Sequence, residues 1–204
     1  MVNVSNKVFE WRGYISAAVL LPVIILSALS APWAPQGGWP DVVLDFLAWL
    51  MLAAGVFVRL WATLYIGGHK STELVSGGPY ALCRHPLYVA SLLIILALTL
   101  FLQSITLLAG AVLIALVYAI VIIPSEEQHV RDCFGTAYHD YCRHTPRFFP
   151  RWRSFERPGL QEVKVAAFLR EFGRTFGFIA LGAGADFLAF CRTQPWWPIL
   201  LRLP

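Results

Sequence analysis

Long apolar runs separated by short polar stretches fill the first 123 residues of the chain. The runs cover residues 14–29, 42–66, 87–102 and 105–123, and the second of them contains Arg59. At 1.5 Å per residue the shortest runs extend roughly 25 Å, close to the thickness of the hydrocarbon core of a bilayer. This pattern predicts four membrane-spanning helices.

The first run has the flank of a signal peptide, because Lys7 and Arg12 precede it. Two prolines interrupt residues 31–35, however, so no clean cleavage site of small residues follows. We therefore interpret the first run as a retained helix. The third and fourth runs are separated only by Gln103 and Ser104, and such a short connection predicts a tight antiparallel helical hairpin.

The pattern changes after residue 150. Apolar side chains recur at helical spacing over residues 165–176, opposite charged ones, which is typical of a helix that lies in the membrane interface. The apolar stretch 176–191 contains Asp186 and three glycines. A fifth crossing of the membrane by this stretch is possible, although its short length and Asp186 favour a re-entrant or surface segment.

The composition agrees with a membrane protein. Hydrophobic residues make up 58% of the 204 residues and charged residues 14%, whereas soluble domains carry about 25% charged residues. The spans leave no room for a nucleotide-binding domain of about 150 residues. We therefore expect an all-α, polytopic transmembrane bundle of four spans, or five, with a cytosolic C-terminal cofactor pocket and no Rossmann domain.

Lysine and arginine predict the topology. Residues 1–13 hold two, 31–40 none, 67–86 two and 124–174 nine. By the positive-inside rule both termini lie in the cytoplasm. The net charge of +4 then faces one leaflet, which indicates contact with anionic lipids rather than nucleic acid. We divide the chain into a transmembrane bundle (1–123, with an inner loop at 67–86), a cytosolic catalytic segment (124–152) and an interfacial C-terminal part (153–204).

Two polar clusters flank the predicted hairpin on its inner side. The first is the sequence Gly-Pro-Tyr-Ala-Leu-Cys-Arg-His-Pro-Leu-Tyr at residues 78–88, and the second starts at Pro124 and contains Glu126, Glu127 and Arg147. Because a hairpin returns the chain to the face that it left, the two clusters should be neighbours in space. We expect a shared cavity between them.

At these positions the chain resembles the superfamily of isoprenylcysteine carboxyl methyltransferases and phospholipid methyltransferases, which are integral membrane enzymes. The resemblance covers about residues 65–152. It is carried by the first cluster, the Glu-Glu pair at 126–127, Phe-Gly at 134–135, Tyr-x-x-Tyr at 138–141 and Arg-Phe-Phe-Pro at 147–150. No single fragment is specific, but the ordered set is.

The resemblance implies that S-adenosylmethionine methylates a lipophilic acceptor that enters from the bilayer. In this family the cofactor pocket faces the cytosol. Arg147 matches the arginine that meets the acceptor headgroup, and Glu127 shares the catalytic role. The residues at matching cofactor positions are Tyr80, Arg84, His85, Pro86, Tyr88, Glu126 and Glu127.

The chemistry of this reaction requires the same residue types. An arginine such as Arg84 can hold the cofactor's carboxylate with two hydrogen bonds, and a glutamate can accept from its ammonium or its ribose hydroxyls. Methyl transfer is a direct displacement, so an ionised carboxylate or thiolate acceptor needs no base. An amine acceptor must lose a proton, for which Glu127 or His85 is the candidate base.

Each motif also has a structural interpretation. Arg84, His85 and Pro86 can simply open a helix at the interface, and one residue of the Glu126–Glu127 pair can serve a helix N-terminus. Arg59 can snorkel inward. The aromatic side chains at 134, 138 and 141 share a helical face, so we interpret them as packing. His129 and Cys133 lie one turn apart without a further ligand motif, and we expect no metal.

Several alternatives stay open at this point. An isoprenylcysteine-like carboxylate is the nominal acceptor, with a phospholipid amine or a small thiol as the alternative. A membrane reductase that uses NADPH, or a non-enzymatic adaptor that docks on anionic lipid, would also carry basic and apolar segments of this kind. The lack of further domains favours a prokaryotic inner membrane.

Overall fold

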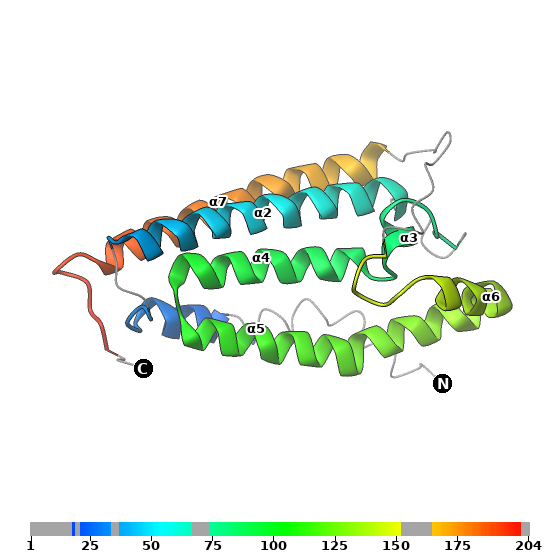
Figure 1. Ribbon diagram of the computed structural model, residues 1–204, viewed down its shortest axis with the longest axis horizontal. Coiled ribbons are helices and arrows are strands. Elements are labelled where there is room, and N and C mark those ends of the chain that lie inside the picture. Colours follow the sequence, from blue (N-terminus) through cyan, green and yellow to red (C-terminus); the bar gives the residue numbers. More distant parts are fainter. Residues whose placement is uncertain (1–17, 19–20, 34–36, 67–73, 152–164, 201–204) are drawn as a thin grey trace. The chain divides into compact units, whose positions relative to one another are not determined.

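The computed structural model describes residues 18, 21–33, 37–66, 74–151 and 165–200. The regular secondary structure of these ranges is helical, which confirms the all-α prediction (Figure 1). The first predicted span, 14–29, is described only at residue 18 and from residue 21 onward, where 21–28 are helical. Residues 67–73 of the inner loop and residues 152–164 and 201–204 of the C-terminal part lie outside the described residues.

Helix α2 spans Trp39–Ile66 and begins three residues earlier than the sequence predicts. Pro40 suits the first helical turn, and Asp41 in that turn places a negative charge at the positive end of the helix dipole. Asp41 Oδ2 also accepts a hydrogen bond from the backbone N–H of Gly37, which lies before the helix, at 2.9 Å. Local sequence therefore accounts for the position of this N-terminus.

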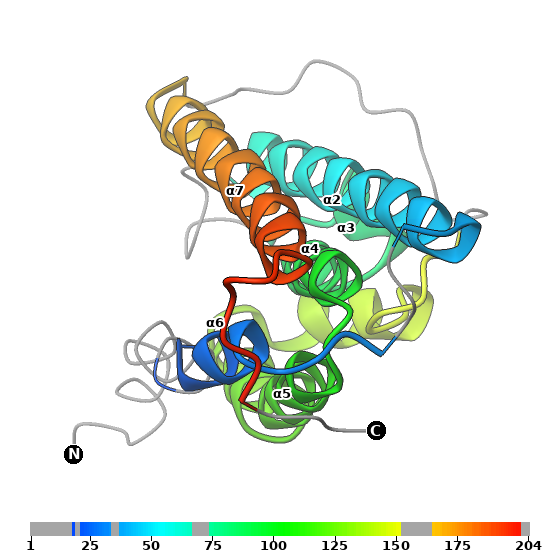
Figure 2. The ribbon, with the colours of Figure 1, turned by 90° about the vertical axis from the view of Figure 1, so that its left-hand side faces the viewer.

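The predicted hairpin is present. Helix α4 spans Pro86–Leu102 and α5 spans Ile105–Val117, and they lie side by side in two views (Figures 1 and 2). The Oγ of Ser104 caps α5 by accepting from the N–H of Leu107. Gln103 adopts a left-handed conformation (φ 43°) and is buried, so the tip is tightly packed although both of its residues are polar.

The helix that contains the fourth predicted span continues beyond residue 123. Helix α5 passes through a π-helical turn, η1 (Tyr118–Ile122), directly into α6 (Ile123–His144). A π turn contains more residues than an α turn, so it changes which face the following residues occupy. Gly135 interrupts α6 with a non-helical conformation (φ 53°), and this kink separates Phe134 from the two tyrosines that the sequence placed on the same face.

The C-terminal part differs from its prediction. Sequence analysis expected an interfacial helix followed by a separate apolar segment, whereas α7 is one continuous helix, Val165–Arg192. Its glycines do not break it, since helical conformation is open to glycine at a modest cost. Among the described residues, three stretches are long and apolar enough to cross a membrane: α2, α7 and the run Ile105–His144; α4 is shorter.

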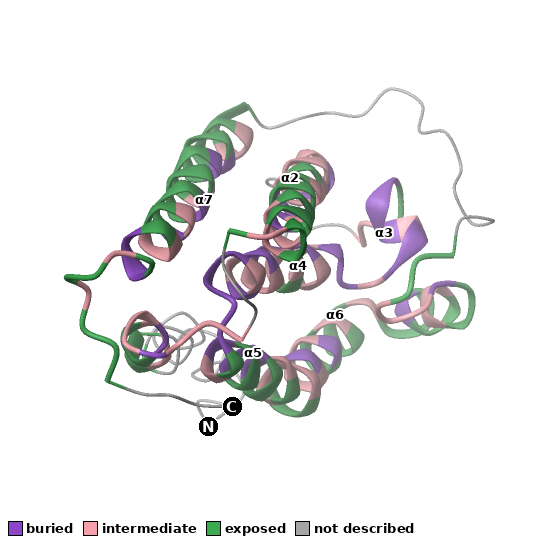
Figure 3. Cartoon of the chain, turned by 60° about the vertical axis from the view of Figure 1, so that its left-hand side comes forward, coloured by how far each residue is buried: buried purple, intermediate pink, exposed green. Residues whose placement is uncertain are grey.

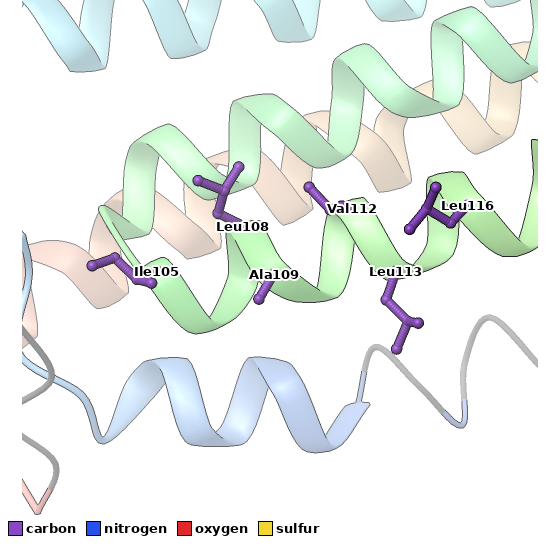
Figure 4. Close-up of a pocket in the computed structure, with 6 residues that line it drawn as sticks. All are labelled: Ile105, Leu108, Ala109, Val112, Leu113 and Leu116. Carbon is purple, nitrogen blue, oxygen red and sulfur yellow. The ribbon is translucent and has the colours of Figure 1, made fainter.

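The chain forms two compact units. Unit 1 consists of residues 1–52, 94–126 and 179–204, and unit 2 of residues 53–93 and 127–178. In unit 1 the backbone of Gly182 in α7 lies against Leu52 of α2. A hollow of about 420 Å³ on α5 has only aliphatic lining, from Ile105 to Leu116, so it carries no group for chemistry (Figure 4).

The core of unit 2 is built around Ala62, Tyr65 and Tyr80. The short helix α3 (Pro79–Leu82) is largely buried, whereas the described part of α7 is mostly exposed (Figure 3). Burial of α3 matters because it carries Tyr80 and leads directly into Arg84 and His85.

Candidate functional site

Three side chains of unit 2 meet at the carboxylate of Glu127. Its Oε1 accepts hydrogen bonds from Arg84 Nη1 at 3.0 Å and Arg147 Nε at 2.9 Å, and lies 3.1 Å from His85 Nε2. Its Oε2 accepts from Arg147 Nη2 at 2.5 Å. We call Arg84, His85, Glu127 and Arg147 the Glu127 cluster. The predicted meeting of the two polar clusters is therefore confirmed for Glu127.

A glycine positions the segment that carries Arg84 and His85. Gly78 precedes α3 with φ 57°, and a Cβ atom at this position would lie 2.3 Å from Cζ of Tyr65. Only glycine avoids both the unfavourable conformation and the collision. The chain thereby turns sharply onto the Tyr65 ring, places Tyr80 in the core and brings Arg84 to the start of α4.

Hydrogen bonds to main-chain carbonyls hold residues 141–151 against residues 80–84. The N–H of Arg84 donates to the carbonyl of Pro146 at 2.9 Å, and the N–H of Arg151 donates to that of Leu82 at 3.0 Å. The hydroxyl of Tyr141 donates to the carbonyl of Tyr80 at 2.7 Å. The first two bonds lie on either side of residue 147, so the backbone positions Arg147 near Glu127, and its guanidinium then donates to both carboxylate oxygens.

Aromatic rings enclose the histidine. The ring of His85 stacks on Tyr88 at 5.6 Å and lies 6.2 Å from the ring of Phe148. Pro86, the first residue of α4, is fully buried. These neighbours restrict the imidazole to one orientation, with Nε2 directed at the carboxylate.

The cluster carries a surplus positive charge, since two guanidinium groups face one carboxylate when His85 is neutral. Glu127 is 4% exposed, and the side chain of Arg147 is 39% exposed. The hydrogen bond to Glu127 raises the pKa of Arg147 further above its usual range, so this arginine stays charged. Burial raises the pKa of the neighbouring Cys83 thiol, against a smaller opposing effect of its backbone hydrogen bond with His85.

The other predicted site residues are placed as follows. Tyr80 is buried in α3, Pro86 opens α4, and Tyr88 contacts His85. Glu126 is half-buried, and the hydrogen bonds that define the cluster go to Glu127 instead. The contacts with Arg84, His85 and Arg147 are therefore made by the second of the adjacent glutamates.

Sequence reasoning missed two supports of the cluster. Arg84 Nη1 also lies 3.2 Å from Cys142 Sγ, and Tyr141, which was interpreted as packing, holds α3. A helical projection of α6 could not find them, because the kink at Gly135 changes the faces of the residues that follow. It also missed an ion pair between Arg59 and Glu171, which lie in different helices.

Comparison with known proteins assigns the chain to a family. The model of the phospholipid methyltransferase family matches residues 44–137, a range that contains Arg84, His85 and Glu127 but ends before Arg147. The chain is also 34% identical, over 98% of its length and 90% of the relative's, to a nickel-cobalt-cadmium resistance protein, NccN, of Alcaligenes xylosoxydans xylosoxydans. The chain belongs to the phospholipid methyltransferase family.

Membership of this family, together with the three long apolar helices of the described residues, identifies the chain as an integral membrane protein. A second relative is the cobalt-zinc-cadmium resistance protein CzcN of Cupriavidus metallidurans, 34% identical over 86% of this chain and 78% of that protein. No solved structure matches the chain.

Proposed function

We propose that the chain is a membrane methyltransferase that transfers the methyl group of S-adenosylmethionine to a lipophilic acceptor. One observation carries the proposal: two arginines and a histidine from distant segments converge on one buried carboxylate. The family model that covers three of these four residues supports the reaction class. The Glu127 cluster is then the polar centre of the site.

The residues present fit the amino-acid part of the cofactor. Arg84 Nε is buried and has no hydrogen-bond partner among the described residues, so this guanidinium keeps a donor for a carboxylate. The surplus positive charge of the cluster favours the same group. Tyr80, Pro86 and Tyr88 would add apolar and aromatic walls. When bound, the cofactor supplies a methyl group on a positively charged sulfur.

Glu127 and Arg147 have paired roles in this proposal. In the structure both carboxylate oxygens of Glu127 are occupied by cationic side chains. Arg147 is the most exposed of them and can turn toward an acceptor headgroup, which frees Glu127 to accept from the cofactor's ammonium. Glu126 stays a second candidate for the cofactor's hydroxyl groups.

The choice between acceptors depends on whether the acceptor must lose a proton before it is methylated. An isoprenylcysteine-like carboxylate is ionised at neutral pH and needs only alignment and exclusion of water, which a buried cluster provides. A phospholipid amine would need Glu127 or His85 to take its proton. Because Glu127 is tied to two arginines, it is a poor base, and we propose the carboxylate first. The distribution of lysine and arginine supports a site on the cytoplasmic side of the membrane, with the N-terminus on that side. Four crossings would return the C-terminus to the cytoplasmic side, whereas a fifth would place it on the opposite side. We propose a prokaryotic inner membrane as the location.

Calorimetry on the purified protein in detergent tests the cofactor. We expect binding of S-adenosylmethionine or its demethylated product, and a loss of affinity of about 10- to 100-fold in Glu127→Gln and in Arg84→Lys. The first change removes the charge of the carboxylate, and the second removes the paired donors of the guanidinium. Arg143→Gln is the matched control, because Arg143 is exposed and pairs only loosely with Asp140, at 3.7 Å.

Several results would contradict this function. Absence of heat with the cofactor, together with binding of NADPH, would favour the reductase. Wild-type affinity in both site variants would move the pocket elsewhere. Transfer of a labelled methyl group to a total-lipid extract, followed by identification of the product, distinguishes a carboxylate ester from a methylated amine.

The names of the two relatives support a second, broader proposal. If this chain contributes to resistance against divalent metals, we propose that it does so through methyl transfer rather than metal binding. In the described ranges no three His, Cys, Asp or Glu side chains are grouped as metal ligands. A strain that depends on the chain for growth in cadmium should then lose that growth with Glu127→Gln and keep it with Arg143→Gln. Full resistance with Glu127→Gln would contradict the proposal.

A further inference from the structure

A second ion-paired group lies within unit 2, where α2, α4 and α7 meet. Arg59 Nε donates to Glu171 Oε1 at 2.5 Å, and Arg59 Nη1 donates to Ser91 Oγ at 2.9 Å. Arg174 Nη1 donates to Glu171 Oε2 at 3.0 Å. We call Arg59, Ser91, Glu171 and Arg174 the Glu171 cluster. Like the Glu127 cluster, it has two guanidinium groups for one carboxylate.

Packing alone gives no reason for this cluster. Arg59 and Glu171 lie in two helices that are long and apolar enough to cross a membrane, and Glu171 is buried. A buried ion pair is often no more stabilising than a well-packed apolar pair, and charged groups within spans are costly. Ionisable residues in such positions therefore point to a ligand or an ion path.

The cluster lies near one end of both helices, next to the headgroup layer of the bilayer that these helices would cross. A helix of 28 residues, the length of α2 and of α7, extends about 42 Å, which matches a bilayer with its headgroups. Arg59 lies seven residues before the end of α2, and Glu171 six residues after the start of α7. Both are thus about 10 Å from a helix end, just inside the hydrocarbon boundary, from which a long arginine side chain reaches the headgroups.

The charge and exposure of the cluster fit an anion. Glu171 fixes both guanidinium groups, while the Arg174 side chain is 66% exposed and Arg59 is 19% exposed. Arg170, one turn before Arg174, is exposed as well. The face of the Arg59 guanidinium is covered by the ring of Phe178 at 5.1 Å, so its remaining donors act in a partly apolar environment, where they bind an anion more strongly than in water. An arginine fork matches the oxygens of a phosphate.

We propose that the Glu171 cluster binds the phosphate of an anionic membrane phospholipid. Glu171 orients Arg59 and Arg174, Ser91 holds Arg59 from α4, and the lipid phosphate neutralises the surplus charge. The lipid is not the methyl acceptor, and the inference is independent of the proposed methyl transfer.

Lipid retention tests this site. The full-length protein is reconstituted in nanodiscs of phosphatidylcholine with phosphatidylglycerol, and the lipids that stay bound after extraction into detergent are counted by native mass spectrometry. We expect preferential retention of phosphatidylglycerol and a higher thermal midpoint when it is present. Arg174→Gln should lower the retention about 5-fold, since one basic residue near the surface contributes about that factor.

A charge-neutral double variant removes the cluster without leaving a buried, unpaired charge. Arg59→Gln with Glu171→Gln should abolish the preference for the anionic lipid, while Arg143→Gln keeps it. Inorganic phosphate added in detergent should not replace the lipid, and if it does, the site binds free phosphate instead. Equal retention in Arg174→Gln and in the double variant, or no preference in the unmodified protein, would overturn the proposal. Cofactor titration in the same nanodiscs reports the methyltransferase function separately.

Discussion

The Glu127 cluster of unit 2 and an arginine centre of unit 1 are built differently. In unit 2, Arg84 and Arg147 share the carboxylate of Glu127. In unit 1, Arg192 is 3% exposed and donates through Nη1 to the carbonyl of Leu102 at 2.5 Å and through Nη2 to the carbonyl of Ser30. Its described partners are thus carbonyls at the C-terminal ends of helical segments.

The difference in partners indicates whether a centre can exchange a partner for a ligand or only links parts of the fold. We call the second kind, represented by Arg192, a clamp. A carboxylate held by several cationic side chains can exchange one of them for a ligand group, because each partner has its own flexible side chain. A guanidinium held by main-chain carbonyls cannot exchange them without unfolding helix ends, and the carbonyls would lose their partner. The first centre is therefore suited to the ligand binding proposed above, and the second to stabilising the fold.

The largest expected effect breaks the clamp. Arg192→Leu leaves the carbonyls of Leu102 and Ser30 without their donor, which should lower the free energy of unfolding by about 2–5 kcal/mol. Thermal unfolding in detergent measures it, with Arg143→Leu as the exposed control. A midpoint equal to that of the control would mean that Arg192 is no clamp.

The next effect acts on the site through its backbone. Gly78→Ala forces alanine into a left-handed conformation and against the ring of Tyr65, which should cost about 2–4 kcal/mol. Because α3 would shift together with Arg84, affinity for S-adenosylmethionine should fall as well. Gly173→Ala serves as control, since nothing lies within 4 Å of a Cβ there. Unchanged affinity in Gly78→Ala would separate the turn from the site.

A smaller effect concerns the support of the site. Tyr141→Phe removes the hydrogen bond to the carbonyl of Tyr80 and should cost about 1 kcal/mol, with only a modest loss of cofactor affinity. Thermal unfolding and calorimetry on the same sample give both values. A loss of affinity as large as that of Glu127→Gln would instead make Tyr141 part of the binding surface.

The smallest perturbation uses the cysteines. Cys133 is exposed and should be alkylated at once by a maleimide, without an effect on cofactor affinity. Cys83 is buried and its pKa is raised, so its thiolate fraction at pH 8 is lower than that of a free thiol. Its alkylation rate should therefore rise at a higher pH than that of a small-molecule thiol, as mass spectrometry can follow. Equal rates for both cysteines would contradict the burial of α3.

Much of the site could be predicted because its motifs are local. The residues 78–88 and the Glu126–Glu127 pair are readable as short sequences, and the two-residue tip of the hairpin implies that they meet. The sequence did not predict that Glu127, rather than Glu126, contacts Arg84 and Arg147. Adjacent helical residues differ in the face they occupy, and that face depends on the path of the preceding helix. The contact of Arg84 with Cys142 could not be predicted either, because the kink at Gly135 changes the face that Cys142 occupies.

The sequence by itself determined the class of the protein, the apolar runs, the hairpin and the two polar clusters, because hydrophobicity and turn chemistry act over a few neighbouring residues. Only the tertiary structure decided that α7 is continuous, that α5 runs through a π turn into α6, and that Arg59 pairs with Glu171 and Arg192 with two carbonyls. These features depend on contacts between residues about 90 to 160 positions apart, or on small shifts of helical register, and hydrophobic periodicity along the chain records neither.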